Sequence, residues 1–175
     1  MKTLIFNDDN LAEDEIQDTI LKARAIIIND AQEVLLSHCA GFYLFPGGKL
    51  RKNESPTKGL LREVREETGI MLKEPVMEPF LQINHIMKNY PKRGKKDLFS
   101  NRCNITDYYL VRANKDIDKS NMNLTSYEKK SNFKTMKIKF NEILPLLSDN
   151  HNTDKRAKCY LREISAVIHE LKNYI

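Results

Sequence analysis

Two segments of the chain place apolar residues three and four positions apart, the spacing of an amphipathic helix. The first segment, residues 56–68, follows Ser55 and starts with Pro56, an N-cap and a proline at the first helical position. It ends before Gly69, a residue that favours the left-handed end of a helix. The second segment covers residues 157–171. We therefore expect a short internal helix and a longer C-terminal helix.

Short apolar or alternating runs around these helices predict β-strands. The runs cover residues 23–28, 33–38, 42–45, 80–87, 105–112 and 137–140. The acidic residues 8–18 predict a surface flap or short helix, and residues 141–147 predict a brief helix that stops or kinks near Pro145. Strands enclosed by two amphipathic helices indicate an α/β fold, a mixed β-sheet in an α/β/α sandwich. The alternative for the C-terminal helix is a dimer interface, so a homodimer stays open.

Composition indicates a soluble globular protein that is one domain over residues 1–175, with 41% hydrophobic and 30% charged residues. No apolar run reaches the roughly 20 residues that span a bilayer, so we expect no membrane segment. The first residues lack the apolar core of a signal peptide. The three cysteines are far apart and without CxxC spacing, which predicts reduced thiols in a cytoplasmic protein.

Three carboxylates of the first helix share one face, because Glu63 lies three and four positions before Glu66 and Glu67. Like charges at this spacing destabilise an isolated helix by roughly 0.2–0.5 kcal/mol per pair. A divalent cation would reverse that repulsion. The glycine-rich loop 45–49 precedes the helix and allows its backbone to approach a metal or a phosphate closely. Arg62 is positioned to pair with Glu54 and to connect the loop to the helix.

The segment from Gly48 to Ile70 resembles a Nudix box. The box consists of glycine, five residues, glutamate, seven residues, and then Arg-Glu-apolar-x-Glu-Glu-x-Gly-apolar. Its fixed positions are filled by Gly48, Glu54, Arg62, Glu63, Val64, Glu66, Glu67, Gly69 and Ile70. The resemblance implies the α/β/α fold and an enzyme that uses Mg²⁺ or Mn²⁺ to hydrolyse a diphosphate linked to another moiety.

The same resemblance implies roles for single residues. Glu63 and Glu67 are the expected metal ligands, Glu66 bridges or assists, and the Gly47 carbonyl is a further ligand. Gly48, Glu54 and Arg62 support the site structurally. Many relatives recruit another acid from a later loop, and Glu128 is the candidate for this catalytic role; a plain surface glutamate is the alternative. Asp107 is a weaker candidate.

The sequence indicates the substrate less clearly than the type of reaction. Residues 88–139 hold fourteen Lys or Arg against five Asp or Glu, which favours a polyphosphate, a dinucleotide or an RNA 5′ end. The candidate substrate-binding residues are Arg24, Lys49, Arg93, Arg102 and Tyr108. Aromatic residues within the basic stretch are of the kind that stack on bases, although core packing explains each of them as well. For His85, a structural role is preferred over substrate contact.

The leading hypothesis is a divalent-metal-dependent pyrophosphohydrolase of nucleotides, such as nucleoside triphosphates. An RNA 5′-end pyrophosphohydrolase is the alternative that the basic stretch suits. A non-hydrolytic nucleotide-binding regulator with the same fold is a third hypothesis, but such proteins usually lack box glutamates and none is missing here. An isomerase of prenyl diphosphates would need a cysteine and a glutamate outside the box, and the sequence does not place them.

Overall fold

The computed structural model describes residues 1–73, 78–92, 97–148 and 155–175. The strands are β1 (Lys2–Phe6), β2 (Asp18–Ile28), β3 (Glu33–Cys39), β4 (Phe42–Leu44), β5 (Gly47–Lys49), β6 (Leu81–Pro91), β7 (Phe99–Arg112) and β8 (Lys134–Lys139). The α-helices are α1 (Pro56–Thr68), α2 (Ser126–Lys130), α3 (Ile143–Ser148) and α4 (Lys155–Leu171). Short 3₁₀ turns lie at Glu13–Glu15, Lys119–Asn121 and Phe140–Glu142.

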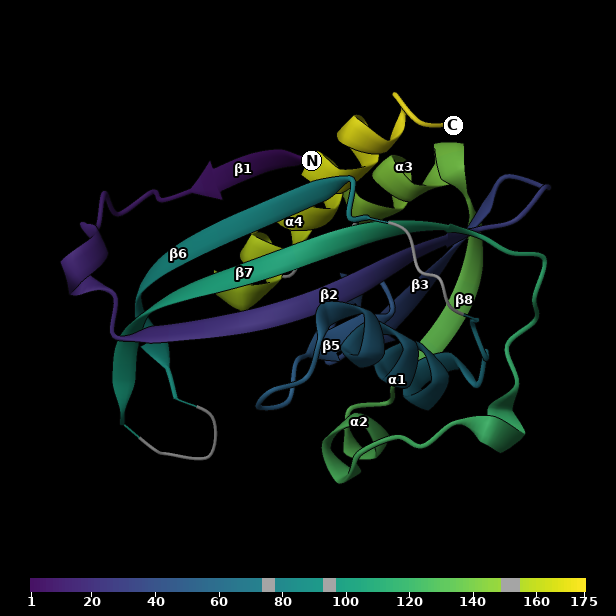
Figure 1. Ribbon diagram of the computed structural model, residues 1–175, viewed down its shortest axis with the longest axis horizontal. Coiled ribbons are helices and arrows are strands. Elements are labelled where there is room, and N and C mark those ends of the chain that lie inside the picture. Colours follow the sequence, from purple (N-terminus) through teal and green to yellow (C-terminus); the bar gives the residue numbers. More distant parts are fainter. Residues whose placement is uncertain (74–77, 93–96, 149–154) are drawn as a thin grey trace.

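All the strands join one mixed sheet with the order β1-β6-β7-β2-β3-β4, in which β5 also pairs with β2 and β8 with β3 (Figure 1). The long strands β2 and β7 run parallel over their full shared length, whereas β6 and β7 are antiparallel. The short strand β5 pairs with β2 at residues 22–24. This pairing holds the glycine loop against the middle of the sheet, just before α1 begins.

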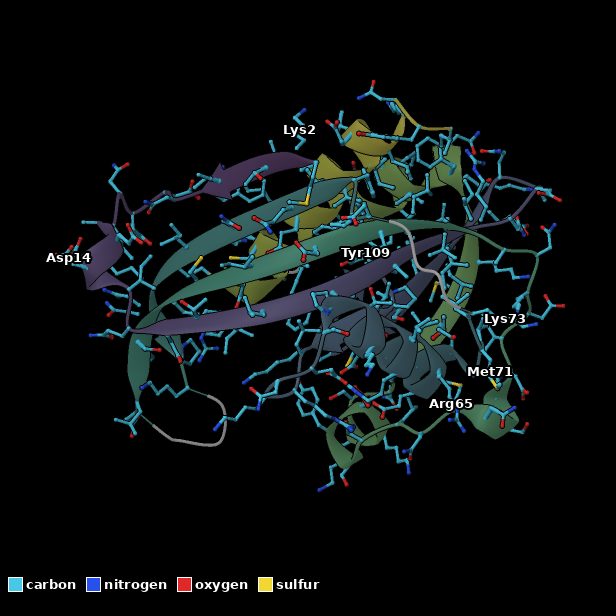
Figure 2. The ribbon with its side chains drawn as sticks, in the orientation of Figure 1. Lys2, Asp14, Arg65, Met71, Lys73 and Tyr109 are labelled. Atoms are coloured by element: carbon cyan, nitrogen blue, oxygen red, sulfur yellow. The ribbon has the colours of Figure 1, made fainter. Side chains whose placement is uncertain are left out.

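Helices cover both faces of this sheet (Figure 1). On one face, Leu60 and Val64 of α1 pack on β2 in a cluster that also contains Tyr109 of β7, which is labelled in Figure 2. On the other face, Ile164 and Ile168 of α4 pack in a larger cluster with β2, β6, β7 and α3. Each sheet face therefore has its own hydrophobic core. The predicted α/β/α sandwich with a mixed sheet between the two helices is confirmed.

Several details of the secondary structure differ from expectation, including the following. The parallel edge strand β1 was not predicted, because its five residues have mixed exposure and show no clean alternation. Strands β2 and β7 begin earlier than their apolar runs. Pro145 does not stop the helix; it lies in the first turn of α3, where a missing N–H removes no helical hydrogen bond. No helix in the described ranges has the length and apolarity needed to cross a bilayer.

Candidate active site

Helix α1 begins and ends where its capping residues predict. Ser55 is extended, and its Oγ accepts a hydrogen bond from the Lys58 amide over 3.4 Å. Gly69 has φ +71°, and its N–H donates to the Arg65 carbonyl. Leu60, Val64 and Glu67 share the buried side of α1, and the carboxylates of Glu63 and Glu67 lie against Gly48 and Gly47 of the glycine loop.

Arg62 connects the loop before α1 to the carboxylates on it. Its Nε and Nη2 atoms donate to the two oxygens of Glu54, each over 2.8 Å. Its Nη1 atom donates to Glu63 over 2.6 Å and to Glu66 over 3.1 Å. Hydrogen bonding to Arg62 lowers the pKa of Glu54 to about 2, against the opposing effect of burial. One guanidinium thus holds three carboxylates in fixed positions.

Glu67 lies deeper than the other two box glutamates. Only 6% of the residue is exposed, and one carboxylate oxygen accepts a hydrogen bond from the Gly47 amide over 3.0 Å. Burial is the main cause that raises its pKa to about 8, although Arg24 opposes the shift. Glu63 packs against Gly48 so closely that a Cβ atom there would lie 2.5 Å from its Oε2 atom. The two glycines therefore bring the backbone directly against Glu63 and Glu67.

The box glutamates border a cavity of about 400 Å³. Glu63, Glu66 and Glu67 line it from α1, and Gly47 and Gly48 line it from β5. A fourth carboxylate, Glu128, lines the same cavity from α2. The Glu128 side chain also closes a capping box, accepting a hydrogen bond from the Thr125 amide over 2.6 Å. The fold thus brings the candidate from the later loop to the cavity of the box glutamates.

The family model for the NUDIX domain matches residues 19–156 of the chain. The chain belongs to the Nudix family. An 8-oxo-dGTP diphosphatase from Proteus vulgaris is 60% identical over 40 residues, a match that covers 23% of this chain and 36% of that protein. The chain thus spans about a third of the length of this curated relative.

Solved structures share the Nudix fold. A MutT protein from Methanosarcina mazei Go1 superposes with a TM-score of 0.56 at 19% identity, covering 89% of this chain and 96% of that one. A bifunctional NMN adenylyltransferase/ADP ribose pyrophosphatase from Francisella tularensis, complexed with AMP and a Mn ion, gives a TM-score of 0.53 at 16% identity. That match covers 87% of this chain and 42% of the other. At these identities the similarity establishes the fold alone.

The donor atoms of this Nudix site suit a hard cation. Carboxylate and carbonyl oxygens are the ligands that Mg²⁺ prefers, and four glutamates and Gly47 line the cavity. Within the described residues, no three acidic, histidine or cysteine side chains already converge as a metal cluster. Arg62 and the Gly47 amide hold the carboxylates instead. Binding a cation would therefore require the glutamates to exchange these partners for the metal.

The predicted substrate-binding residues of this Nudix domain separate into different environments. Lys49 lines the carboxylate cavity and a neighbouring one, and Arg102 lines only the neighbouring one. Arg24 borders the carboxylate cavity but is 6% exposed, and its guanidinium donates to the carbonyls of Phe45 and Gly47. Arg24 therefore holds the glycine loop in place from the protein interior. Arg93 lies outside the described residues.

Tyr108, a candidate substrate-binding residue, lies in the protein core instead. Its side chain is buried among core residues, with 1% exposed, and its hydroxyl donates to Glu163 of α4 over 3.0 Å. The residue lies on the sheet face that α4 covers, so it has no access to substrate. Asp107 points to the other face and accepts a hydrogen bond from Gln82 over 2.8 Å. It does not line the carboxylate cavity.

Sequence reasoning missed a buried polar network between the sheet and α4. The Nδ1 atom of His85 lies 2.8 Å from Glu163, whose second carboxylate oxygen accepts from Tyr108. Despite its burial, the pKa of His85 is raised to about 9 by hydrogen bonds to Cys159 and Glu163. Glu163 lies among the apolar positions of the C-terminal segment, and that break in the pattern was the available signal. The structural role expected for His85 agrees with this network.

Proposed function

We propose that this Nudix domain is a divalent-metal-dependent pyrophosphohydrolase that cleaves the diphosphate of a nucleotide. The observation that carries the proposal is the convergence of Glu63, Glu66, Glu67 and Glu128 on one cavity beside the glycine loop. A binding protein without catalysis has no need for this concentration of carboxylates. The complete box supports hydrolysis over the non-hydrolytic alternative.

The proposed ligands of Mg²⁺ or Mn²⁺ are Glu63, Glu66, Glu67 and the Gly47 carbonyl. When bound, the cation neutralises and orients the diphosphate and activates water. Arg62 and Glu54 fix α1 against the loop, so that the carboxylates keep their relative positions. Glu128 lines the same cavity from α2, a different element from the one that carries the other acids. We assign it the removal of the proton from the attacking water.

A nucleoside triphosphate is the proposed substrate class. Its support is the family, the name of the curated relative, and the cations Lys22 and Lys49 beside the carboxylate cavity. An RNA 5′ end is the second candidate, because the excess of basic residues in 88–139 suits a polyanion. Some of these charges are already used within the protein, since Lys137 pairs with Asp116 and Arg102 with Asp18. This internal pairing favours the smaller substrate.

We also infer a reducing, cytoplasmic environment. Cys39, Cys103 and Cys159 form no disulfide among the described residues, and two of them are buried. Nucleoside triphosphates are intracellular substrates, which agrees with thiols that remain reduced.

A panel assay tests the proposal. Purified protein with Mg²⁺ is given nucleoside triphosphates, nucleotide sugars, dinucleoside polyphosphates and triphosphorylated RNA, and the products are separated and quantified. We expect cleavage within a diphosphate of at least one nucleoside triphosphate, and faster turnover of free nucleotides than of RNA. The Glu67→Gln variant is assayed alongside and should lose this activity. Absence of hydrolysis throughout the panel would refute the proposal.

A further inference from the structure

A second cavity of about 530 Å³ adjoins the carboxylate cavity. The two share Cys39, Leu44, Lys49 and Tyr127 in their linings, so a ligand can extend from one into the other. Beyond the shared part, residues of β2, β7 and α4 line the second cavity. It contains none of the box glutamates, and the catalytic proposal leaves it without a role.

The walls of the second cavity combine aromatic rings with cations. Phe42 of β4 and Tyr160 of α4 lie with ring centroids 5.6 Å apart, and the Lys22 ammonium is 5.7 Å from the Tyr160 ring. Further along, the Arg102 guanidinium lies 4.8 Å from the Tyr90 ring. Aromatic faces next to cations bind planar, electron-rich rings by stacking and also tolerate nearby phosphates. A nucleobase has these properties.

The side chain of Asn104 in this cavity has no hydrogen-bond partner among the described residues. Asn104 of β7 lines the cavity and is only 5% exposed. Its amide forms no hydrogen bond with any described residue. Its cross-strand neighbour His85 is already bound to Glu163. The Asn104 amide is not among the side-chain groups that are fully buried without a partner, so it is open to the cavity. An unengaged amide at the wall of a cavity therefore points to a hydrogen bond with a ligand.

We propose that the second cavity holds the base of the nucleotide and that Asn104 determines which base is preferred. The proposal rests on the proposed function, in which the diphosphate lies among the box glutamates. The asparagine amide offers one donor and one acceptor side by side, so it pairs with a base edge that presents an acceptor next to a donor. Phe42 and Tyr160 supply stacking that is independent of base identity, and Lys49 lies where the two cavities meet.

Two substitutions separate hydrogen bonding from simple packing. Asn104→Asp replaces the donor by an acceptor, and two acceptors match the adjacent N1–H and N2–H₂ donors of guanine. We expect the ratio of kcat/KM for guanine over adenine triphosphate to rise at least tenfold, which corresponds to about 1.4 kcal/mol. Asn104→Leu should raise KM by about tenfold and reduce the preference among bases, with kcat nearly unchanged. A ratio is independent of how much of a variant folds.

The matched control is Asn84→Leu. Asn84 is the residue before His85 on β6, so its side chain points to the opposite face of the sheet, and its Oδ1 atom is buried without a partner among the described residues. This variant should keep the wild-type ratio. Base preferences that are unchanged in both Asn104 variants would overturn the proposal.

A binding measurement separates failure of this inference from failure of the proposed function. If wild-type protein hydrolyses no triphosphate, adenosine and guanosine are titrated without metal and amide chemical shifts are followed by NMR. Saturable shifts in β7 and α4 that disappear in Asn104→Leu support the base site without any catalysis. Absence of saturable shifts in the wild type refutes it.

Discussion

Arg62 and Glu54 form a bidentate pair in which two guanidinium nitrogens donate to the two carboxylate oxygens, each over 2.8 Å. Both side chains are largely buried, with 17% and 14% exposed. We predict that Glu54→Gln lowers the free energy of unfolding by about 1.5–3 kcal/mol, the range for hydrogen bonds to charged groups. Urea unfolding at pH 7 measures this. Asp116→Asn, at an ion pair whose carboxylate is 93% exposed, should change stability by less than about 0.5 kcal/mol.

The ion pair between Arg62 and Glu54 also makes the free energy of unfolding depend on pH. Hydrogen bonding to Arg62 lowers the folded-state pKa of Glu54 to about 2, below the value of 4.5 expected when unfolded. Its contribution is therefore complete above pH 4.5 and is lost as the pH falls toward 2. Urea unfolding measured between pH 6 and 2.5 should show a free energy of unfolding that falls less steeply with pH for Glu54→Gln than for the wild type. Identical slopes would show that this carboxylate titrates normally in the folded protein.

Gly48 provides a test of how Glu63 is positioned. An added Cβ atom would lie 2.5–2.9 Å from the Glu63 carboxyl atoms, so Gly48→Ala should push that carboxylate out of place. We expect the Mg²⁺ concentration for half-maximal activity to rise about 10–100-fold, the usual effect of disturbing groups that orient metal ligands. Lys58→Ala, on the exposed side of α1, is the control and should leave the metal requirement unchanged. An unchanged requirement in Gly48→Ala would remove Glu63 from the metal site.

Glu128 has two separable tasks, because it caps α2 and borders the cavity. Glutamine still accepts the capping hydrogen bond but cannot remove a proton. Glu128→Gln should therefore fold normally and lose about 10²–10⁴-fold in kcat while KM stays close to the wild-type value. Thr125→Ala removes the cap and keeps the carboxylate; it should retain most of the activity. Near-normal turnover in Glu128→Gln would leave Glu128 with its capping role alone.

The buried network below α4 predicts a second pH effect, at alkaline pH. Hydrogen bonds to Cys159 and Glu163 outweigh burial and raise the pKa of His85 to about 9, from 6.5 in the unfolded chain. The stabilisation is complete below pH 6.5 and is lost as the pH rises through 9. Glu163→Gln should cost about 3–5 kcal/mol at pH 6, because it leaves a buried charge without its partner. Urea unfolding at pH 6 and 9.5 should show a smaller pH dependence in the variant.

Local signals made the box helix predictable from sequence. Ser55, Pro56 and Gly69 act within one turn of the helix ends, so their positions alone set its bounds. Glu128 approaches the box only because α2 precedes β8 and β8 pairs with β3, a tertiary relationship that spacing alone does not specify. Tyr108 was misassigned for a related reason. Both faces of β7 are covered by helices, so alternation along the strand does not show which aromatic residue faces which layer.

The buried amide of Asn104 could not be recognised from the sequence either. Asparagine is depleted in strands, and nothing in the sequence shows that β7 is paired on both sides, with β6 and β2. Only the assembled sheet shows that this side chain lies at a cavity wall.

The most direct test of the account compares the Mg²⁺-dependent hydrolysis of a nucleoside triphosphate by the wild type and by Glu67→Gln. Glu67 is the most deeply buried box carboxylate, and glutamine keeps its shape but cannot ionise to bind a cation. The account predicts that kcat rises with Mg²⁺ and saturates for the wild type, that the protein is inactive in chelator, and that kcat falls at least 10³-fold in the variant. Equal rates for the two proteins, or wild-type hydrolysis that persists in chelator, would contradict it.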